Sequence, residues 1–114
     1  MSLVAGIDAG TQSIKLVVYD AASKQVVAST SAPLELISGD DGSREQLASW
    51  WIDGVRSCFA QLDAATRRSI AAISVSGQQH GFVPLDREGN VLAPVKLWCD
   101  TSSSAECGEI MDAV

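Results

Sequence analysis

The sequence predicts an α/β fold in which an antiparallel three-stranded meander is followed by a helix and further strands. Three observations lead to this prediction. Two strand-like runs near the N-terminus are joined by a short glycine turn, a central run has helical apolar spacing, and a short apolar run follows it. β-Branched and aromatic runs favour strands, and apolar gaps of three and four favour a helix. The order strand, helix, strand favours a right-handed crossover.

The meander is predicted from residue type and turn chemistry. Its strands are expected over Leu3–Asp8, Ser13–Asp20 and Gln25–Ser31. Four residues separate the first two strands, which predicts a hairpin, and the turn 21–24 leads into the third. Residues 33–43 are expected to form a loop, because positions 38–42 read Ser-Gly-Asp-Asp-Gly, a strong turn composition.

One apolar face defines the central helix. It consists of Leu47, Trp51, Val55, Cys58, Phe59 and Leu62. The start of the helix stays open: Ser43 and Gln46 have capping-box spacing, whereas extended chain could continue as far as Leu47. Trp50 and Trp51 are both expected to be packing residues, with Trp51 in the apolar stripe and Trp50 beside it.

The second half of the chain predicts a fourth, fully buried strand over Ile70–Ser76 and a helix that begins near Thr101. Ser103 and Glu106 have capping-box spacing at the start of this helix. Between these elements, residues 81–86 and 91–98 read as extended arms around the turn 86–90, and their prolines restrict them to edges or irregular stretches. The amphipathic pattern has no stop signal at Val114, so we expect the chain to be the first part of a longer protein.

Composition narrows the class of protein. The 114 residues suffice for one small domain, and the formal net charge is −6. Excess acid without a basic cluster argues against a nucleic-acid partner. No apolar run approaches the roughly 18 residues that span a bilayer, and no signal peptide precedes the first strand, so we expect a soluble, cytoplasmic protein without a membrane role. Cys58, Cys99 and Cys107 lack C-x-x-C spacing and are expected to be free thiols.

The stretch "GIDAGTQSIKLVVYD" places an acid among groups that suit an anion. Asp8 could be a turn acid that binds nearby amides. Alternatively, Gly10 allows close backbone approach, and the amides around residues 11–12 could form an anion-binding concavity. The hydroxyls of Thr11 and Ser13 and the charge of Lys15 lie nearby. An acid among such groups is explained by a divalent cation between it and a phosphate, which is how Mg²⁺ usually binds.

Two further stretches carry candidate binding residues. In "SGQQHGFVPLD", Gln78, Gln79 and His80 follow a strand, where open α/β sheets bind ligands, although a lone histidine could be structural. Their donors and acceptors suit a polyhydroxylated ligand. In "VKLWCD", Trp98 could be a core residue or an aromatic wall, and Asp100 could be a helix N-cap or a ligand to a sugar.

The glycine turn and the lysine-bearing strand after it resemble the first phosphate loop of the superfamily that contains sugar kinases, actin and large heat-shock chaperones. The order D-A-G-T-Q-S, W-W, G-Q-Q-H-G and L-W-C-D resembles, over essentially the whole chain, the FGGY carbohydrate kinases and, within them, the xylulokinases. Relatives that act on glycerol usually carry Arg-Glu where Gln79 and His80 stand. The resemblance therefore favours D-xylulose over glycerol.

The resemblance implies an actin-like (ribonuclease H-like) N-terminal domain, of which residues 1–114 are an incomplete part, with a second, C-terminal domain outside the chain. ATP and Mg²⁺ would be the cofactors, and a ketose would be the substrate. Asp8 would hold Mg²⁺ through water and is needed for activity in this family. The general base would lie beyond residue 114, so the 114 residues alone are expected to be inactive. The full-length form could be a homodimer.

The resemblance also assigns residues to the two ligands. The phosphoryl group would be bound by Gly10, Thr11, Gln12, Ser13 and Lys15. The sugar would be bound by Gln79, His80, Trp98 and Asp100. Two alternatives stay open: another FGGY kinase, acting on ribulose, glycerol or another polyol, and a non-catalytic actin-like module that binds a partner or a sugar.

Overall fold

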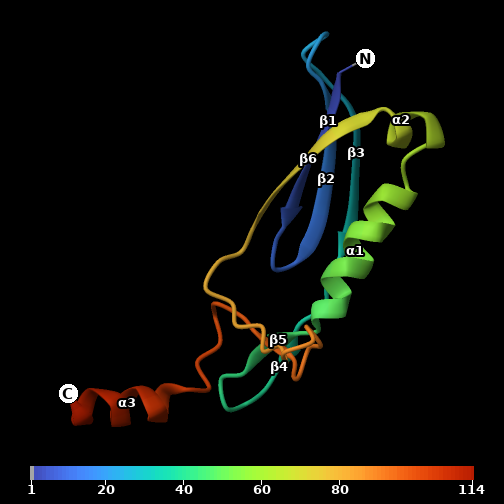
Figure 1. Cartoon of the computed structure of the whole chain (residues 1–114). Helices are drawn as coiled ribbons and strands as arrows, with labels where there is room; N and C mark the ends of the chain where they lie inside the picture. The colour runs from blue at the N-terminus through green and yellow to red at the C-terminus, as the bar shows by residue number, and fades with distance from the viewer. Residues whose placement is uncertain (1) are drawn as a thin grey trace. The chain divides into compact units, whose positions relative to one another are not determined.

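The computed structural model describes residues 2–114, which divide into two compact units (Figure 1). The first unit comprises the chain up to Leu34 together with Ser49–Gln78. The second unit comprises Glu35–Ala48 and Gln79–Val114. Within residues 2–114, no helix has the length and apolar character needed to cross a bilayer.

The first unit is built on a four-stranded sheet with the order β3-β2-β1-β6. Its strands are β1 (Leu3–Ala9), β2 (Ser13–Asp20), β3 (Gln25–Pro33) and β6 (Ile70–Gly77). The first three pair as an antiparallel meander, and β6 pairs with β1 in parallel (Figure 1). This arrangement confirms the predicted α/β class, with a meander, a helix and a returning strand.

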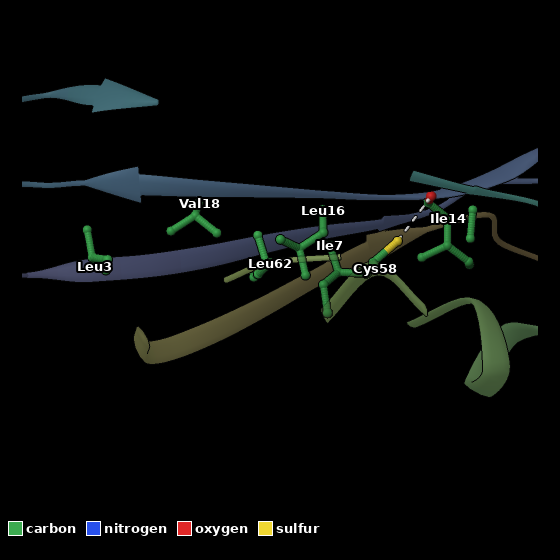
Figure 2. Close-up of a cluster of buried hydrophobic side chains, with 8 residues drawn as sticks. Leu3, Ile7, Ile14, Leu16, Val18, Cys58 and Leu62 are labelled. Atoms are coloured by element: carbon green, nitrogen blue, oxygen red, sulfur yellow. Dashed lines mark hydrogen bonds between the residues drawn. The ribbon is translucent and has the colours of Figure 1, made fainter. Parts of the chain in front are cut away.

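One face of this sheet carries the hydrophobic core. Along β1 and β2, buried residues alternate with exposed ones, as the two-residue period of a strand requires. The helix α1 (Ala48–Ala60) and the turn after it pack on the buried face. The cluster contains Leu3, Ile7, Ile14, Leu16, Val18, Ala32, Cys58 and Leu62 (Figure 2). The Cys58 thiol donates to the carbonyl oxygen of Ile14 at 3.6 Å, which satisfies its weak donor inside the core (Figure 2).

The central helix begins later than a capping box at Ser43 would place it. Residues Arg44–Gln46 form the short strand β5, and α1 starts at Ala48, so the alternative of continued extended chain is confirmed. A second, five-residue helix, α2 (Ala64–Arg68), was not predicted, because one turn and a half shows no apolar period. Its start is fixed locally: the Asp63 carboxylate accepts the backbone N–H of Thr66 at 2.8 Å.

The prediction that the fourth strand is fully buried is wrong. In β6, Ile73 is 55% exposed and Val75 is 66% exposed. The strand lies at the edge of the sheet, paired with β1 on one side, and the core under α1 is built by residues of β1, β2 and β3. An apolar run therefore indicated the strand correctly, but it could not indicate which neighbour would cover it.

The second unit contains a small antiparallel sheet with the order β4-β5-β7. Its other strands are β4 (Ile37–Ser38) and β7 (Val95–Lys96), and α3 (Ser104–Ala113) ends the chain. The two predicted arms face each other through bridges between Phe82 and Lys96 and between Leu85 and Val91. Ser103 is the N-cap of α3 but makes no side-chain cap bond, so the predicted capping box is wrong, as is the N-cap alternative for Asp100.

Candidate functional site

The β1–β2 turn, residues 9–13, is tightly closed. The Gly10 N–H donates to the carbonyl oxygen of Ser13 at 3.1 Å. A Cβ on Gly10 would lie 3.2 Å from that same oxygen, which is closer than ordinary contact. The glycine is thus explained by closure of the turn, in addition to the ligand access predicted for it. The Gln12 carbonyl, within the same turn, accepts the Leu34 N–H at 2.9 Å, which ties the turn to the end of β3.

Gln78 braces this turn from the end of β6. Its backbone N–H donates to the Ala9 carbonyl at 3.1 Å, and its side-chain Nε2 lies 3.4 Å from the Gly10 carbonyl. The Thr11 hydroxyl donates to Gln78 Oε1 at 3.4 Å. Gly77 permits this approach, because a Cβ there would lie 2.8 Å from the Ala9 carbonyl oxygen. Sequence reasoning treated Gln78 as a sugar-facing donor; the adjacent Gly77 was the signal that the backbone comes close here.

The sheet face opposite the core carries the charged groups beside the turn. Asp8 of β1 pairs in register with Lys15 of β2 and with Ser76 of β6. These three side chains line a depression of about 400 Å³, together with Gly6, Ile7, Val17 and Ser74. Gly6 helps to keep it open, because no atom lies within 4 Å of the position of a Cβ there. Acid, ammonium and hydroxyl groups therefore face one open space.

The Asp8 carboxylate is available to a ligand. Within residues 2–114, no hydrogen bond or ion pair engages its oxygens, and the residue is exposed. No group of three His, Cys, Asp or Glu side chains within this range is arranged to hold a metal ion. Mg²⁺ does not need such a group, since it usually keeps several waters and takes other ligands from phosphates. A single carboxylate beside a closed glycine turn fits that mode of binding.

His80 has an unusual backbone conformation. Its φ is +63°, in the left-handed region, although it is not glycine. Such conformations cost free energy and cluster at binding sites. His80 and Gln79 are both exposed, and the chain becomes regular two residues later, where Phe82 exchanges backbone hydrogen bonds with Lys96 at 2.8 and 3.1 Å. Both side chains are therefore accessible to a ligand.

Trp98 lies on a turn that follows β7. The Asp100 N–H donates to the Leu97 carbonyl at 3.0 Å, which places Trp98 and Cys99 at the two central positions. Trp98 is 59% exposed, so the alternative of a core residue is wrong. By contrast, Leu97 is buried. An exposed indole on a closed turn is suited to pack against the carbon face of a sugar.

Asp100 is occupied by bonds within the second unit. One carboxylate oxygen, Oδ2, accepts the Arg44 backbone N–H at 2.8 Å, and Oδ1 accepts the N–H and hydroxyl of Ser102 at 2.9 and 2.6 Å. The Lys96 ammonium lies 3.6 Å from Oδ2. The Ser102 hydroxyl, followed by the Arg44 N–H, holds the pKa of this carboxyl well below its ordinary value. These contacts would compete with a sugar for the Asp100 carboxylate, to which the sequence assigned a role in sugar binding.

The predicted site residues therefore form two sets. The first unit brings together Asp8, Gly10, Thr11, Gln12, Ser13 and Lys15 around one turn and one sheet face. The second unit carries Gln79, His80, Trp98 and Asp100. Sequence reasoning missed the residues that support each set: Gln78 under the first, and Arg44, Lys96 and Ser102 around the second.

Comparison with known proteins agrees with the fold and the motifs. Residues 3–113 match the sequence model described as the FGGY family of carbohydrate kinases, N-terminal domain. The chain is 42% identical over 110 residues to the xylulose kinase of Streptomyces coelicolor, a match that covers 96% of the chain and 22% of that protein.

Solved structures show the same similarity. The xylulose kinase of Rhodospirillum rubrum matches with a TM-score of 0.88 and 30% identity, over 98% of the chain and 23% of that structure. The gluconate kinase of Lactobacillus acidophilus matches with a TM-score of 0.80 and 28% identity, over 98% and 23%. The chain thus spans less than a quarter of the length of these relatives. It belongs to the FGGY family of carbohydrate kinases, and the part of that family it matches is the N-terminal domain.

Proposed function

We propose that this chain is the N-terminal part of an ATP-dependent xylulokinase that transfers the γ-phosphoryl group of ATP to the 5-hydroxyl of D-xylulose. The observation that carries the proposal is the placement of Asp8 and Lys15 as neighbours on an open sheet face, beside a closed glycine turn. Phosphoryl transfer depends mainly on positioning and charge neutralisation, which these groups supply. Family membership and the relatives' names support the kinase assignment.

Each residue has a defined task in this proposal. The turn residues Gly10–Ser13 position the transferred phosphoryl group, and Lys15 adds positive charge beside it. Asp8 holds the hydration shell of Mg²⁺, which when bound neutralises charge on the phosphates. Gln79 and His80 bind hydroxyls of the ketose, and Trp98 packs against its carbon face. A base outside the 114 residues accepts the proton of the attacking hydroxyl.

Xylulose is proposed over other substrates because of Gln79 and His80, which stand where glycerol-specific relatives carry Arg-Glu. Because the chain is also similar to a gluconate kinase, other sugars stay open as alternative substrates. Selectivity among similar sugars depends on single hydroxyl contacts, since a mismatch leaves buried polar groups unpaired. A non-catalytic actin-like module remains the alternative from a different functional class. We further propose that the enzyme acts in the cytoplasm.

The test is a panel of sugars with the full-length protein. We expect ATP turnover to depend on D-xylulose, with a higher kcat/KM than for ribulose, glycerol or gluconate. A higher kcat/KM for another sugar would replace the substrate and keep the kinase. A reading frame that stops at codon 114 would instead support the binding module, whereas a continuing frame with a second glycine-rich phosphate loop would support the kinase.

A further inference from the structure

The turn that carries Trp98 is fastened at both ends to one residue of the neighbouring strand. At its start, the Leu97 N–H donates to the Arg44 carbonyl at 3.0 Å. At its end, the Arg44 N–H donates to the Asp100 carboxylate at 2.8 Å. The backbone of Arg44 in β5 therefore sets the position of the whole turn, and the second of the two bonds depends on the Asp100 side chain.

The other contacts of the Asp100 carboxylate also lie within the second unit. Ser102 supplies two donors, and the Lys96 ammonium, 3.6 Å away, also lies 3.0 Å from the Ser102 hydroxyl and 3.7 Å from the Glu45 carboxylate. The Asp100 side chain is only 4% exposed. A carboxylate that already accepts three hydrogen bonds and is almost fully covered has little capacity left for the hydroxyls of a sugar.

The same network extends toward His80. Lys96, whose ammonium faces Asp100, pairs through its backbone with Phe82 on one side and with Glu45 of β5 on the other. Phe82 is two residues from His80. Through β7, the segment that carries His80 and the turn 97–100 are both connected to β5.

We propose that Asp100 is a positioning residue that orients Trp98 for the sugar and does not touch the sugar itself. Its carboxylate fixes the turn 97–100 on the backbone of β5, and the indole of Trp98 packs against the ketose. This proposal rests on the proposed kinase function and replaces the role of sugar ligand that the sequence suggested for Asp100. Charge-assisted hydrogen bonds are roughly twice as strong as neutral ones, so loss of the charge should loosen the turn.

The test uses the full-length enzyme with Asp100→Asn, an isosteric change that places an amide donor opposite the donors of Arg44 or Ser102. We expect the KM for D-xylulose to rise at least about tenfold, the size expected when a charge-assisted bond is lost, while the KM for ATP stays unchanged. Asp41→Asn is the matched control. Asp41 also accepts the N–H and hydroxyl of a serine two residues on, Ser43, but within residues 2–114 its carboxylate makes no hydrogen bond or ion pair with the turn 97–100, so the KM values of the Asp41→Asn enzyme should not change.

A double-mutant cycle separates positioning from direct contact. If Asp100 acts through Trp98, then Asp100→Asn should change the KM for xylulose less than about twofold in a Trp98→Ala background. Independent, multiplying effects of the two substitutions would make Asp100 a direct ligand and overturn the proposal. An unchanged KM in a folded Asp100→Asn enzyme would overturn it as well.

A spectroscopic measurement makes the proposal testable without turnover. In a ¹⁵N–¹H spectrum, the indole N–H signal of Trp98, assigned by its loss in Trp98→Phe, should shift and broaden in Asp100→Asn. The signals of Trp50 and Trp51, assigned in the same way, should stay in place. An unmoved Trp98 signal contradicts the positioning role. Absence of sugar-dependent turnover in the wild-type enzyme contradicts the proposed function alone, because the indole signal still reports on the turn.

Discussion

Asp8 and Lys15 are direct cross-strand partners in the first hairpin, and both side chains lie on the sheet face opposite the core. Their Cα positions are paired in the antiparallel register of β1 and β2, and only one further pair, Ala9 with Ile14, separates them from the glycine turn. No ion pair within 4.0 Å joins the two side chains in residues 2–114. The geometry leaves both charges available to a third group in the depression between them.

Replacement of Asp8 should remove activity without unfolding the protein. In the full-length enzyme, Asp8→Ala is expected to lower kcat by at least about a hundredfold, as loss of one electrostatic group at a reacting centre commonly does. The thermal transition should change little, because the side chain is exposed and has no internal bond to lose. Steady-state kinetics and circular dichroism would check both parts. Asp53→Ala, on the exposed side of α1, is the control, and near-normal turnover by Asp8→Ala would refute the assigned role.

Gly54 sets how closely α1 approaches the sheet. A Cβ at this position would lie 2.7 Å from Cγ1 of Ile14, so Gly54→Ala should force the helix outward and cost about 1–3 kcal/mol of unfolding free energy. Gly108→Ala in α3 is the matched control, since nothing lies within 4 Å of its Cβ position. That substitution should be neutral or stabilising by up to about 1 kcal/mol. Urea unfolding measures both, and equal effects would contradict the close approach.

The Asp100 network should make stability depend on pH in the acid range. The carboxylate has a folded-state pKa lowered from its ordinary value of 3.8, so it stabilises the fold fully above that value. The contribution is lost as the pH falls below 3.8 and through the folded-state pKa. Asp100→Asn should therefore lower the melting temperature at pH 7, and its difference from wild type should shrink as the pH falls below 3.8. A difference that is constant with pH would contradict the linkage.

The 114 residues on their own should be inactive and should self-associate through β6. This strand is at the edge of the sheet and exposes Ile73 and Val75, and exposed apolar edge strands pair readily with other chains. Val75→Lys should shift the chain toward monomer in light scattering after gel filtration. Met111→Lys, which adds the same charge to exposed α3, should not. A wild-type monomer with a sharp cooperative thermal transition, or with xylulose-dependent turnover, would contradict this prediction.

The meander and its first glycine turn could be predicted because their signals are local. Strand-forming runs on either side of four turn residues determine the hairpin, and the Asp8–Lys15 pairing follows from its register. The exposure of Val75 and the hydrogen-bond partners of Asp100 could not be predicted in the same way. Each depends on which partner the fold supplies, an edge position for Val75 and the backbone of Arg44 for Asp100. Arg44 is 56 positions from Asp100, and no periodicity in the sequence connects them.

In β1, Asp8, which we propose holds Mg²⁺ through water, directly follows a residue of the hydrophobic core. Ile7 is buried under α1, and Asp8 faces the open side. A slip of β1 by a single residue would exchange the two faces, placing the carboxylate in the hydrophobic layer and the isoleucine on the open face, where we propose that phosphate binds. The packing of Leu3, Ala5 and Ile7 therefore determines which residues of β1 face the proposed phosphate site. Under the proposed kinase function, turnover by the full-length enzyme requires the correct register of β1, so core substitutions that preserve volume but disturb pairing should be detected first as lost turnover.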